Sequence, residues 1–249
     1  MSDSAVLTAP PTLQVLHDDG DLVAIDKPAG LLVHASTLDA HEALNALDLL
    51  QAQLGRSLWP LHRLDKGTSG VLLFATSAQA AAHWGAAFRE GRVRKRYVAL
   101  VRGWPPAHGR IDHPLARDPE RPSAGQPMRE AVTLFERLAC FEWPFAVDGR
   151  HATSRYALVA VEPLTGRRHQ IRRHFKHIAH PLIGDATHGK GVHNRAVAQW
   201  LGVQRLWLHA QAMQLPRADG GAVRIEAPCG AEWGRLQTEG VPEPIPTCS

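Results

Sequence analysis

Cysteine is scarce in this 249-residue chain, which contains only three. Cys140, Cys229 and Cys248 lie far apart in the sequence, and none of them belongs to a CxxC pair. An odd number of scattered cysteines excludes a disulfide scaffold and a zinc site built from cysteines. This usage is typical of a reducing compartment, and we therefore expect a cytoplasmic protein.

Long hydrophobic runs are also missing. No apolar stretch approaches the ~18 residues that a membrane-spanning helix requires. The first residues, MSDSAVLTAPPT, include an acid and have neither the basic start nor the apolar centre of a signal peptide. We therefore expect a soluble protein without a membrane partner.

Aromatic residues make up 6% of the chain and charged residues 21%, which is an ordinary globular composition. The net charge of +4 conceals two basic clusters. They comprise Arg89, Arg92, Arg94, Lys95 and Arg96 in the first, and Arg167, Arg168, Arg172, Arg173 and Lys176 in the second. Charge runs usually form solvated faces, but two clusters at pI ≈ 9.2 favour a polyanionic partner, nucleic acid before membrane.

The apolar pattern predicts more strands than helices. Strands are expected at 22–25, 31–33, 70–76, 96–103, 154–163, 205–215 and 222–228, and helices at 44–54, 78–89 and 169–178. Ser77 is a candidate N-cap and Gly55 a candidate helix stop. Tight turns join several strands, which favours an α+β fold with one large mixed, mostly antiparallel sheet flanked by helices and loops.

The sequence shows no linker between separate cores, so we predict a single domain over residues 13–240. Residues 1–12 are expected to form a loose tail and residues 241–249 a Pro-rich tail. Residues 112–129 are rich in proline and in charges of both signs, which predicts a surface excursion loop. Asp219, Gly220 and Gly221 predict a hairpin turn.

One carboxylate stands among bases in the stretch PLHRLDKGTSGVLLFA, residues 60–75. Asp65 lies between Arg63 and Lys66, directly before a run that reads as a buried strand. Loops at strand ends often build sites, so Asp65 could be a nucleophile that its neighbours keep ionised. It could also be a turn acceptor for a nearby amide such as that of Thr68, which is the commoner role of an isolated aspartate.

The helix expected at 169–178 is predicted to extend back to Arg168, which then lies on it four residues before Arg172. They lie about 100° from the apolar stripe that contains Ile171, so they would point toward a cleft if that stripe is buried. An arginine opposite a carboxylate lowers the pKa of the acid by about 1–3 units and orients it. A structural ion pair or plain phosphate contacts would use the same residues.

Tyr97 lies inside the first basic cluster. With a strand period of two, its side chain faces opposite Arg96 and Val98. An aromatic ring between cations suits stacking on a nucleobase beside phosphate-binding arginines, although a lone tyrosine more often belongs to a core.

Together these motifs resemble the RluA family of pseudouridine synthases. HRLDKGTSGVLLF resembles the family's first signature, and EPLTGRRHQIRRH its arginine block. The blocks DLVAIDKPAGLLVH, KRYVALVRG, HPLIGD and LWLHAQAMQL match in the same order, so the similarity spans Leu13 to Pro228. It implies the catalytic domain of the family, and the early start of the blocks suggests that the S4-type RNA-binding domain of many members is absent.

The resemblance implies roles for individual residues. Asp65 is the implied catalytic residue, whose carboxylate attacks C1′ or the base or removes a ribose proton, and Arg172 is its implied ion-pair partner. Tyr97 is the implied stacking platform and candidate base for the C5 proton. The other implied substrate contacts are Arg63, which enters the space left by the extruded base, His62, Thr68, Arg168 and Ile171. RNA-backbone contacts are expected from Arg92, Arg94, Lys95, Arg96, Arg167 and Arg173.

The family reaction needs no cofactor or metal, and we expect a monomer that has no obligate protein partner. Among family members, those that act on uridine 65 of tRNA are the most similar to this chain in its short length and in the sequence between the motifs. Ribosomal RNA or another tRNA position is the alternative substrate.

Two other functions compete with this interpretation. His169, His174, His177 and His180 suggest a zinc hydrolase, but the surrounding arginines oppose cation binding and no HExxH motif is present. A non-catalytic RNA-binding module that kept the fold is the alternative from another class.

Overall fold

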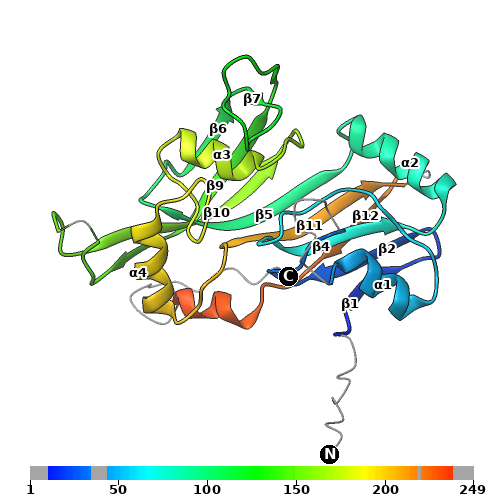
Figure 1. Ribbon diagram of the computed structural model, residues 1–249, viewed down its shortest axis with the longest axis horizontal. Helices are drawn as coiled ribbons and strands as arrows, with labels where there is room; N and C mark the ends of the chain where they lie inside the picture. The colour runs from blue at the N-terminus through cyan, green and yellow to red at the C-terminus, as the bar shows by residue number, and fades with distance from the viewer. Residues whose placement is uncertain (1–10, 35–43, 148, 218–219, 238–249) are drawn as a thin grey trace, which may run out of the picture.

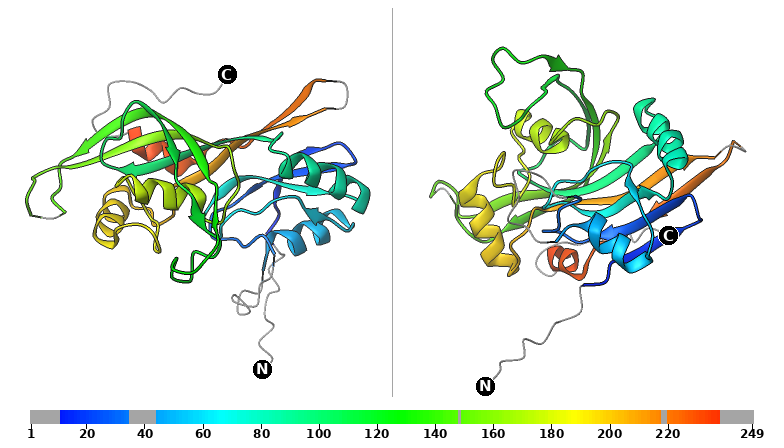
Figure 2. Two further views of the ribbon diagram at one scale, coloured as in Figure 1. Left: turned by 90° about the horizontal axis from the view of Figure 1, so that it is seen from above. Right: turned by 45° about the vertical axis from the view of Figure 1, so that its right-hand side comes forward.

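The computed structural model describes residues 11–34, 44–147, 149–217 and 220–237. One sheet of ten strands runs through the molecule, and the helices pack around it (Figures 1 and 2). Eight of the strands follow the order β1-β2-β4-β11-β5-β10-β9-β6, while β12 pairs with β11 and β3 with β4. Within the described residues the only parallel pair of this sheet is β4 with β11, so the predicted α+β fold with a mixed, mostly antiparallel sheet is confirmed.

The strands are β1 (Gln14–Asp18), β2 (Leu22–Lys27), β3 (Trp59–Pro60), β4 (Ser69–Ala75), β5 (Arg94–Arg102), β6 (His108–Asp112), β7 (Leu115–Ala116), β8 (Met128–Arg129), β9 (Val132–Trp143), β10 (Ser154–Pro163), β11 (Leu208–Pro216) and β12 (Ala222–Glu226). The helices are α1 (Ala46–Leu54), α2 (Ala78–Arg89), α3 (Gln170–His177) and α4 (Gly191–Leu201), with a 3₁₀ helix at Ala231–Gln237. None of the described helices is long and apolar enough to cross a membrane.

Local sequence signals set the ends of α1 and α2. The Asn45 side chain accepts the amide of Asp48 at 3.0 Å, and Gly55 ends α1 in the left-handed region at φ 66°. The Ser77 hydroxyl accepts the amide of Ala80 at 3.0 Å, as predicted from the sequence. Both helices begin and end close to the residues that these signals indicate.

Side-chain alternation along β5 divides the core into two clusters. Tyr97, Ala99 and Val101 belong to the larger cluster, which also contains α1 and α3 residues, while Val98 and Leu100 belong to a second cluster with α4. Because successive strand residues point to opposite faces, Tyr97 lies away from Val98, as predicted. The larger cluster supports the centre of the sheet, where β4, β11 and β5 are neighbours.

The strand predicted at residues 31–33 is wrong. Leu32 forms only an isolated parallel bridge with Asn45, and the carbonyls of Leu32 and Val33 accept the amides of Ala46 and Leu47 at 2.8 and 3.0 Å. The segment therefore satisfies the free amides at the start of α1, which an apolar run alone does not reveal.

The excursion loop predicted at residues 112–129 is correct in part. Its two ends pair as the short ladder β7–β8, and residues 117–127 between them form no regular element. The hairpin of β11 and β12 is confirmed, although Asp219 of its turn lies outside the described residues. Residues 1–10 and 238–249, which include most of the predicted tails, also lie outside them.

Candidate active site

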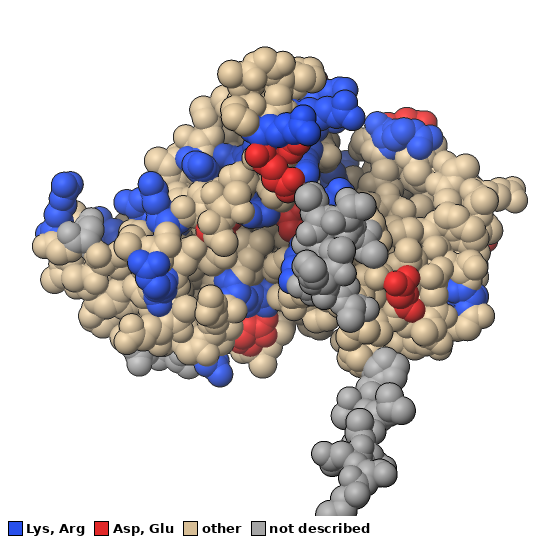
Figure 3. Space-filling model, in the orientation of Figure 1, with Lys and Arg blue, Asp and Glu red and all other residues tan. Residues whose placement is uncertain are grey.

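A cavity of about 570 Å³ opens above the centre of the sheet. Its lining comes from the loop before β4, from β5, from β11 and from the segment around the start of α3. Lysine and arginine side chains gather beside the hollow that separates the α2 side of the molecule from the α3 side (Figure 3). The predicted site residues Asp65, Tyr97 and Arg172 all line this cavity, as do His62, Arg63, Thr68, Lys95, Arg167, Arg168 and Ile171.

The Asp65 turn presents its carboxylate to the cavity. The backbone carbonyl of Asp65, not the side chain, accepts the amide of Thr68 at 2.9 Å. The turn-acceptor alternative therefore applies to the main chain and leaves the side chain available. Beneath the turn, the fully buried Lys27 donates to the carbonyls of Pro28, Leu31 and Lys66 at 2.8, 2.8 and 3.2 Å.

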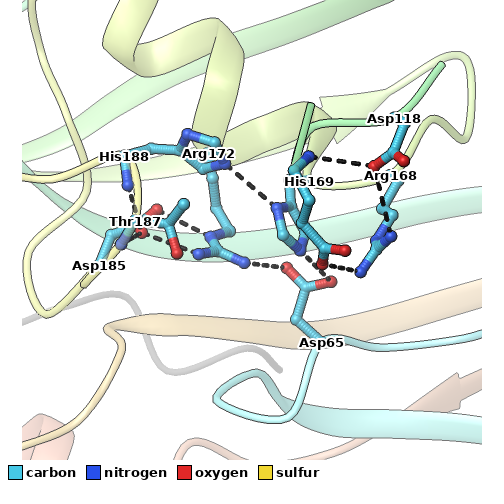
Figure 4. A network of polar contacts seen from close by, with 9 residues as sticks. Asp65, Asp118, Arg168, His169, Arg172, Asp185, Thr187 and His188 are labelled. Atoms are coloured by element: carbon cyan, nitrogen blue, oxygen red, sulfur yellow. Dashed lines mark hydrogen bonds and ion pairs between the residues drawn. The ribbon is translucent and has the colours of Figure 1, made fainter. Parts of the chain in front are cut away.

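Arg172 pairs with Asp65, as the sequence predicted. Its Nη1 donates to Asp65 Oδ2 at 2.8 Å, and the two residues are 107 positions apart in the chain (Figure 4). The other side of the same guanidinium binds Asp185 with both donors, Nε to Oδ2 at 2.7 Å and Nη2 to Oδ1 at 2.8 Å. One arginine therefore serves two carboxylates, and only the Asp65 carboxylate faces the cavity.

Asp185 is the buried anchor of this network. Its side chain has no exposed surface, and Oδ1 also accepts the amides of Thr187 and His188, both at 2.9 Å. Burial alone would raise the pKa of Asp185, but the hydrogen bonds and charge of Arg172 outweigh it and lower the pKa. Burial would also lower the pKa of Arg172, yet Asp185 and Asp65 raise it above its usual value. Arg172 is therefore a permanent cation in a fixed orientation.

Tyr97 and Ile171 supply the apolar walls of the cavity. Both are nearly buried, with 8% and 7% of their surfaces exposed, and Lys95 lies on the same side of β5 as Tyr97. Burial, and then the charge of Asp65, raise the pKa of the Tyr97 phenol well above its usual value. Tyr97 is thus a neutral phenol near pH 7, and its ring forms part of the cavity wall.

Arg168 is not on the helix, contrary to the prediction. Helix α3 begins at Gln170, after His169 in the left-handed region, so Arg168 precedes the helix and does not share a helical face with Arg172. It still lines the cavity, but its guanidinium is paired with Glu120 and lies 3.8 Å from Asp118, both in the excursion loop (Figure 4). Arg168, which was expected to contact substrate, is therefore paired with two acids of the excursion loop.

The side chains of His62 and Arg63 differ in their contacts and in their exposure to solvent. His62 Nε2 accepts the amide of Leu73 at 3.1 Å and its ring stacks on Phe88. Burial, and then the charge of Lys95, lower the pKa of His62 to about 3, so it is a neutral, fixed part of the wall. The Arg63 side chain is exposed at the rim of the cavity and makes no hydrogen bond or ion pair with the described residues.

The residues expected on the RNA backbone differ in their exposure and in the contacts that they make. Arg92, Arg94 and Arg167 are exposed, and Arg96 lies 3.9 Å from Glu162. Lys95 reaches into the cavity, where burial, and then Arg167, lower its pKa to about 8. Arg173 donates to the carbonyl of Ala116 at 2.9 Å, so it holds the excursion loop as well as carrying charge.

The four histidines of the zinc alternative do not converge. His174 contacts Thr133 and the carbonyl of His113, while His180 donates to the carbonyl of Arg102. His177 stacks on His113, and His169 contacts His188. Across the described part of the chain, no three His, Cys, Asp or Glu side chains form a group that could hold a metal ion.

The residues that support Asp65 and Arg172 were not predicted from the sequence. Asp185, His188 and Lys27 carry this support, and His169 was noted only as a zinc candidate. The Gly-Asp pair that ends HPLIGD is a signal for a turn at Asp185, because glycine and aspartate are typical turn residues. No local pattern could have linked it to Arg172.

Comparisons with known proteins agree with this site. Residues 21–177 match the family model described as RNA pseudouridylate synthase. The chain is similar to "tRNA pseudouridine synthase C" of Vibrio cholerae, with 43% identity over 207 residues that cover 81% of this chain and 84% of the relative. The protein of the same name from Yersinia pestis is 39% identical over 233 residues, which cover 91% and 90% of the two chains.

Two solved structures share the fold. "Human RNA Pseudouridylate Synthase Domain Containing 4" superposes with a TM-score of 0.67 at 26% identity, covering 90% of this chain and 92% of that one. "Human RNA Pseudouridylate Synthase Domain Containing 1" has a TM-score of 0.70 at 24% identity, over 89% and 86% of the two chains. The family model covers more than half of the chain and the curated relatives most of it, and the chain therefore belongs to the RNA pseudouridylate synthase family, as an isomerase of the RluA type.

Proposed function

We propose that this enzyme converts uridine 65 of tRNA to pseudouridine, with Asp65 of the protein as the catalytic aspartate. Support for tRNA comes from the name that the similar curated proteins share. The reaction breaks the bond between ribose C1′ and N1 of uracil, rotates the base and joins C1′ to C5. The C5 proton is lost and N1 gains one, so the isomerisation is balanced without an oxidant or reductant.

The observation that carries the proposal is the pair of Asp65 and Arg172 at the floor of the cavity. Arg172 holds Oδ2 at 2.8 Å, whereas Oδ1 has no partner within hydrogen-bond distance in the described structure. Oδ1 is therefore the oxygen available to attack C1′ or the base, or to remove a ribose proton. Arg172 orients the carboxylate through this hydrogen bond while substrate is bound.

The cavity suits an extruded uracil. Its volume of about 570 Å³ lies within the range of small-molecule sites, ~300–1,000 Å³. Tyr97 and Ile171 would contact the base on two sides, and extrusion costs a few kcal/mol, which these contacts offset. Arg63, exposed at the rim, would fill the space that the base leaves in the RNA.

The exposed basic residues would bind phosphates without regard to sequence. Each phosphate contact releases condensed counterions, so affinity falls as salt rises. We expect the Kd for tRNA, measured by filter binding, to weaken by at least about 10-fold between 50 and 200 mM salt. A Kd that stays flat over this range would contradict electrostatic docking.

Tritium release from RNA that carries 5-tritiated uridine tests the proposal, because uridine and pseudouridine have equal mass. The wild-type enzyme should release tritium from tRNA with a uridine at position 65 and not from the same tRNA with cytidine there. Asp65→Asn should bind this tRNA normally and release none. Release only from ribosomal RNA fragments would overturn the tRNA assignment, and no release from any RNA would favour the non-catalytic module.

A further inference from the structure

His169 has a backbone conformation that needs an explanation. It is one of two non-glycine residues with positive φ among the described residues, at 53°, and it precedes α3 without capping the helix through its side chain. Such conformations are unfavourable for most non-glycine residues and persist where the surroundings enforce them, often at functional sites. The strained backbone turns the ring toward the cavity, which His169 lines together with Asp65.

The two ring nitrogens of His169 face different partners (Figure 4). Nε2 lies 3.7 Å from Asp65 Oδ1, the oxygen that Arg172 does not hold. Nδ1 lies 3.1 Å from Nε2 of His188, within hydrogen-bond distance. The ring therefore connects the available oxygen of Asp65 to a second histidine behind it.

Electrostatic interactions favour one combination of tautomers for His169 and His188. If His169 carried its proton on Nδ1, the Nε2 lone pair would face the Asp65 carboxylate and repel it. If His188 donates from Nε2 to Nδ1 of His169, the His169 proton sits on Nε2 and its positive end faces Oδ1. The second arrangement is favourable at both contacts, so His188 fixes the tautomer of His169.

His188 is itself held firmly. It is 8% exposed, and its amide binds Asp185, the residue that also clamps Arg172. Glycines flank this turn because nothing larger fits: a Cβ on Gly184 would lie 1.7 Å from the carbonyl oxygen of Arg205, and one on Gly189 2.3 Å from that of Asp185. One rigid turn therefore supports both groups that face the Asp65 carboxylate.

We propose that His169, with its tautomer fixed by His188, is a positioning residue for Oδ1 of Asp65. This inference rests on the proposed role of Asp65 as the catalytic residue. At 3.7 Å the contact is too long for a hydrogen bond in the free enzyme, and a shift of less than 1 Å during substrate closure completes it. Arg172 then fixes one carboxylate oxygen and His169 orients the other toward the ribose or the base.

The charges around His169 are consistent with a neutral donor. Burial lowers the pKa of His169, Asp65 and Asp185 oppose this effect, and Arg172 and Arg168 add to it. Burial also lowers the pKa of His188 to about 4, so His188 is neutral near pH 7 and can donate from Nε2. The pair then holds Oδ1 without adding a positive charge that would compete with substrate.

Replacing the ring by two residues of different chemistry tests the proposal. His169→Phe keeps the ring size without an N–H, whereas His169→Gln keeps a donor of similar reach, and both tolerate left-handed backbone poorly to a similar degree. The single-turnover rate of His169→Phe should fall about 10-fold with the Kd for tRNA unchanged, and His169→Gln should recover to within about 3-fold of wild type. Equal losses in both variants, or a loss confined to Kd, would overturn the proposal.

A double-mutant cycle tests the role of His188. His188→Leu should lower the single-turnover rate several-fold, and His188→Gln, which retains a donor, should not. Because His188 acts through His169, adding His188→Leu to His169→Phe should cause no further loss. Additive losses would show that His188 acts independently of His169 and would contradict its role in fixing the His169 tautomer.

Asp65→Asn distinguishes this inference from the proposed function. If Asp65→Asn remains active, the role of Asp65 is wrong and the His169 proposal fails with it. If Asp65→Asn is inactive but His169→Phe retains the wild-type rate, only the His169 proposal fails.

Discussion

At the scale of the residue, the unusual feature is one guanidinium shared by two carboxylates. Asp185 has no exposed side-chain surface and accepts two hydrogen bonds from Arg172, so it fixes the direction in which the third donor of Arg172 reaches Asp65. Removing one partner of a buried charge pair costs about 3–5 kcal/mol, because the remaining charge is left uncompensated. We therefore expect Asp185 to act on catalysis through Arg172.

We expect Asp185→Asn to lower the free energy of unfolding by about 2–4 kcal/mol and the single-turnover rate by about 10–100-fold, while the Kd for tRNA changes little. Urea denaturation and single-turnover assays measure the two effects. Asp112→Asn is the matched control, because its pairing with Arg110 is more than half exposed and should contribute almost nothing. A wild-type rate in folded Asp185→Asn would contradict the positioning role.

At the scale of the element, the sequence predicted what local rules determine. Helix α2 has the predicted bounds because Ser77 caps it, and β4 was found from its unbroken apolar run. Strand β9 and helix α4 were not predicted. Much of β9 is only half buried, so its pattern does not alternate cleanly, and α4 follows Lys190, which makes no side-chain cap. Tertiary packing stabilises both elements where local signals are weak.

The excursion loop supplies the prediction at this scale. Asp118 and Glu120 hold Arg168 beside the cavity, in the position where an RNA phosphate would compete for it. Asp118→Asn together with Glu120→Gln should free the arginine and tighten tRNA binding about 2–5-fold at low salt, as expected for an exposed ion pair. Filter binding measures the Kd of this double variant.

The control changes net charge equally without touching Arg168. Asp112→Asn together with Glu142→Gln removes two acids that pair with Arg110 and Arg155 instead. If this control tightens binding as much as the loop variant, the effect is general charge and not release of Arg168.

At the scale of the whole molecule, the site joins segments that are far apart in sequence. Asp65 precedes β4, Tyr97 lies on β5, Arg172 on α3 and Asp185 follows α3, and the order of strands in the sheet brings them together. Sequence motifs identified three of these four residues. They could not identify Asp185 as the anchor of Arg172, because the pairing depends on how the turn after α3 folds back onto the helix.

The fold also buries neutral histidines, and this sets how its stability depends on pH. The folded pKa values of His62 and His188 are about 3 and about 4, and burial lowers those of His174 and His209 as well. An unfolded histidine titrates near 6.5, so between about pH 4 and 6.5 the unfolded state binds more protons. Stability is then fully present above pH 6.5 and is lost as the pH falls.

We expect the free energy of unfolding to fall by roughly 2–4 kcal/mol between pH 7 and pH 5 through His62 and His188 together. Urea denaturation at both pH values measures the change. In His62→Gln with His188→Gln, neither position titrates, while glutamine can still accept the amide of Leu73 and donate to His169. The pH dependence of this double variant should therefore be shallower than that of wild type, since His174 and His209 still contribute. An unchanged slope would mean that the folded protein does not lower the pKa of these two histidines, contrary to the effect of their burial.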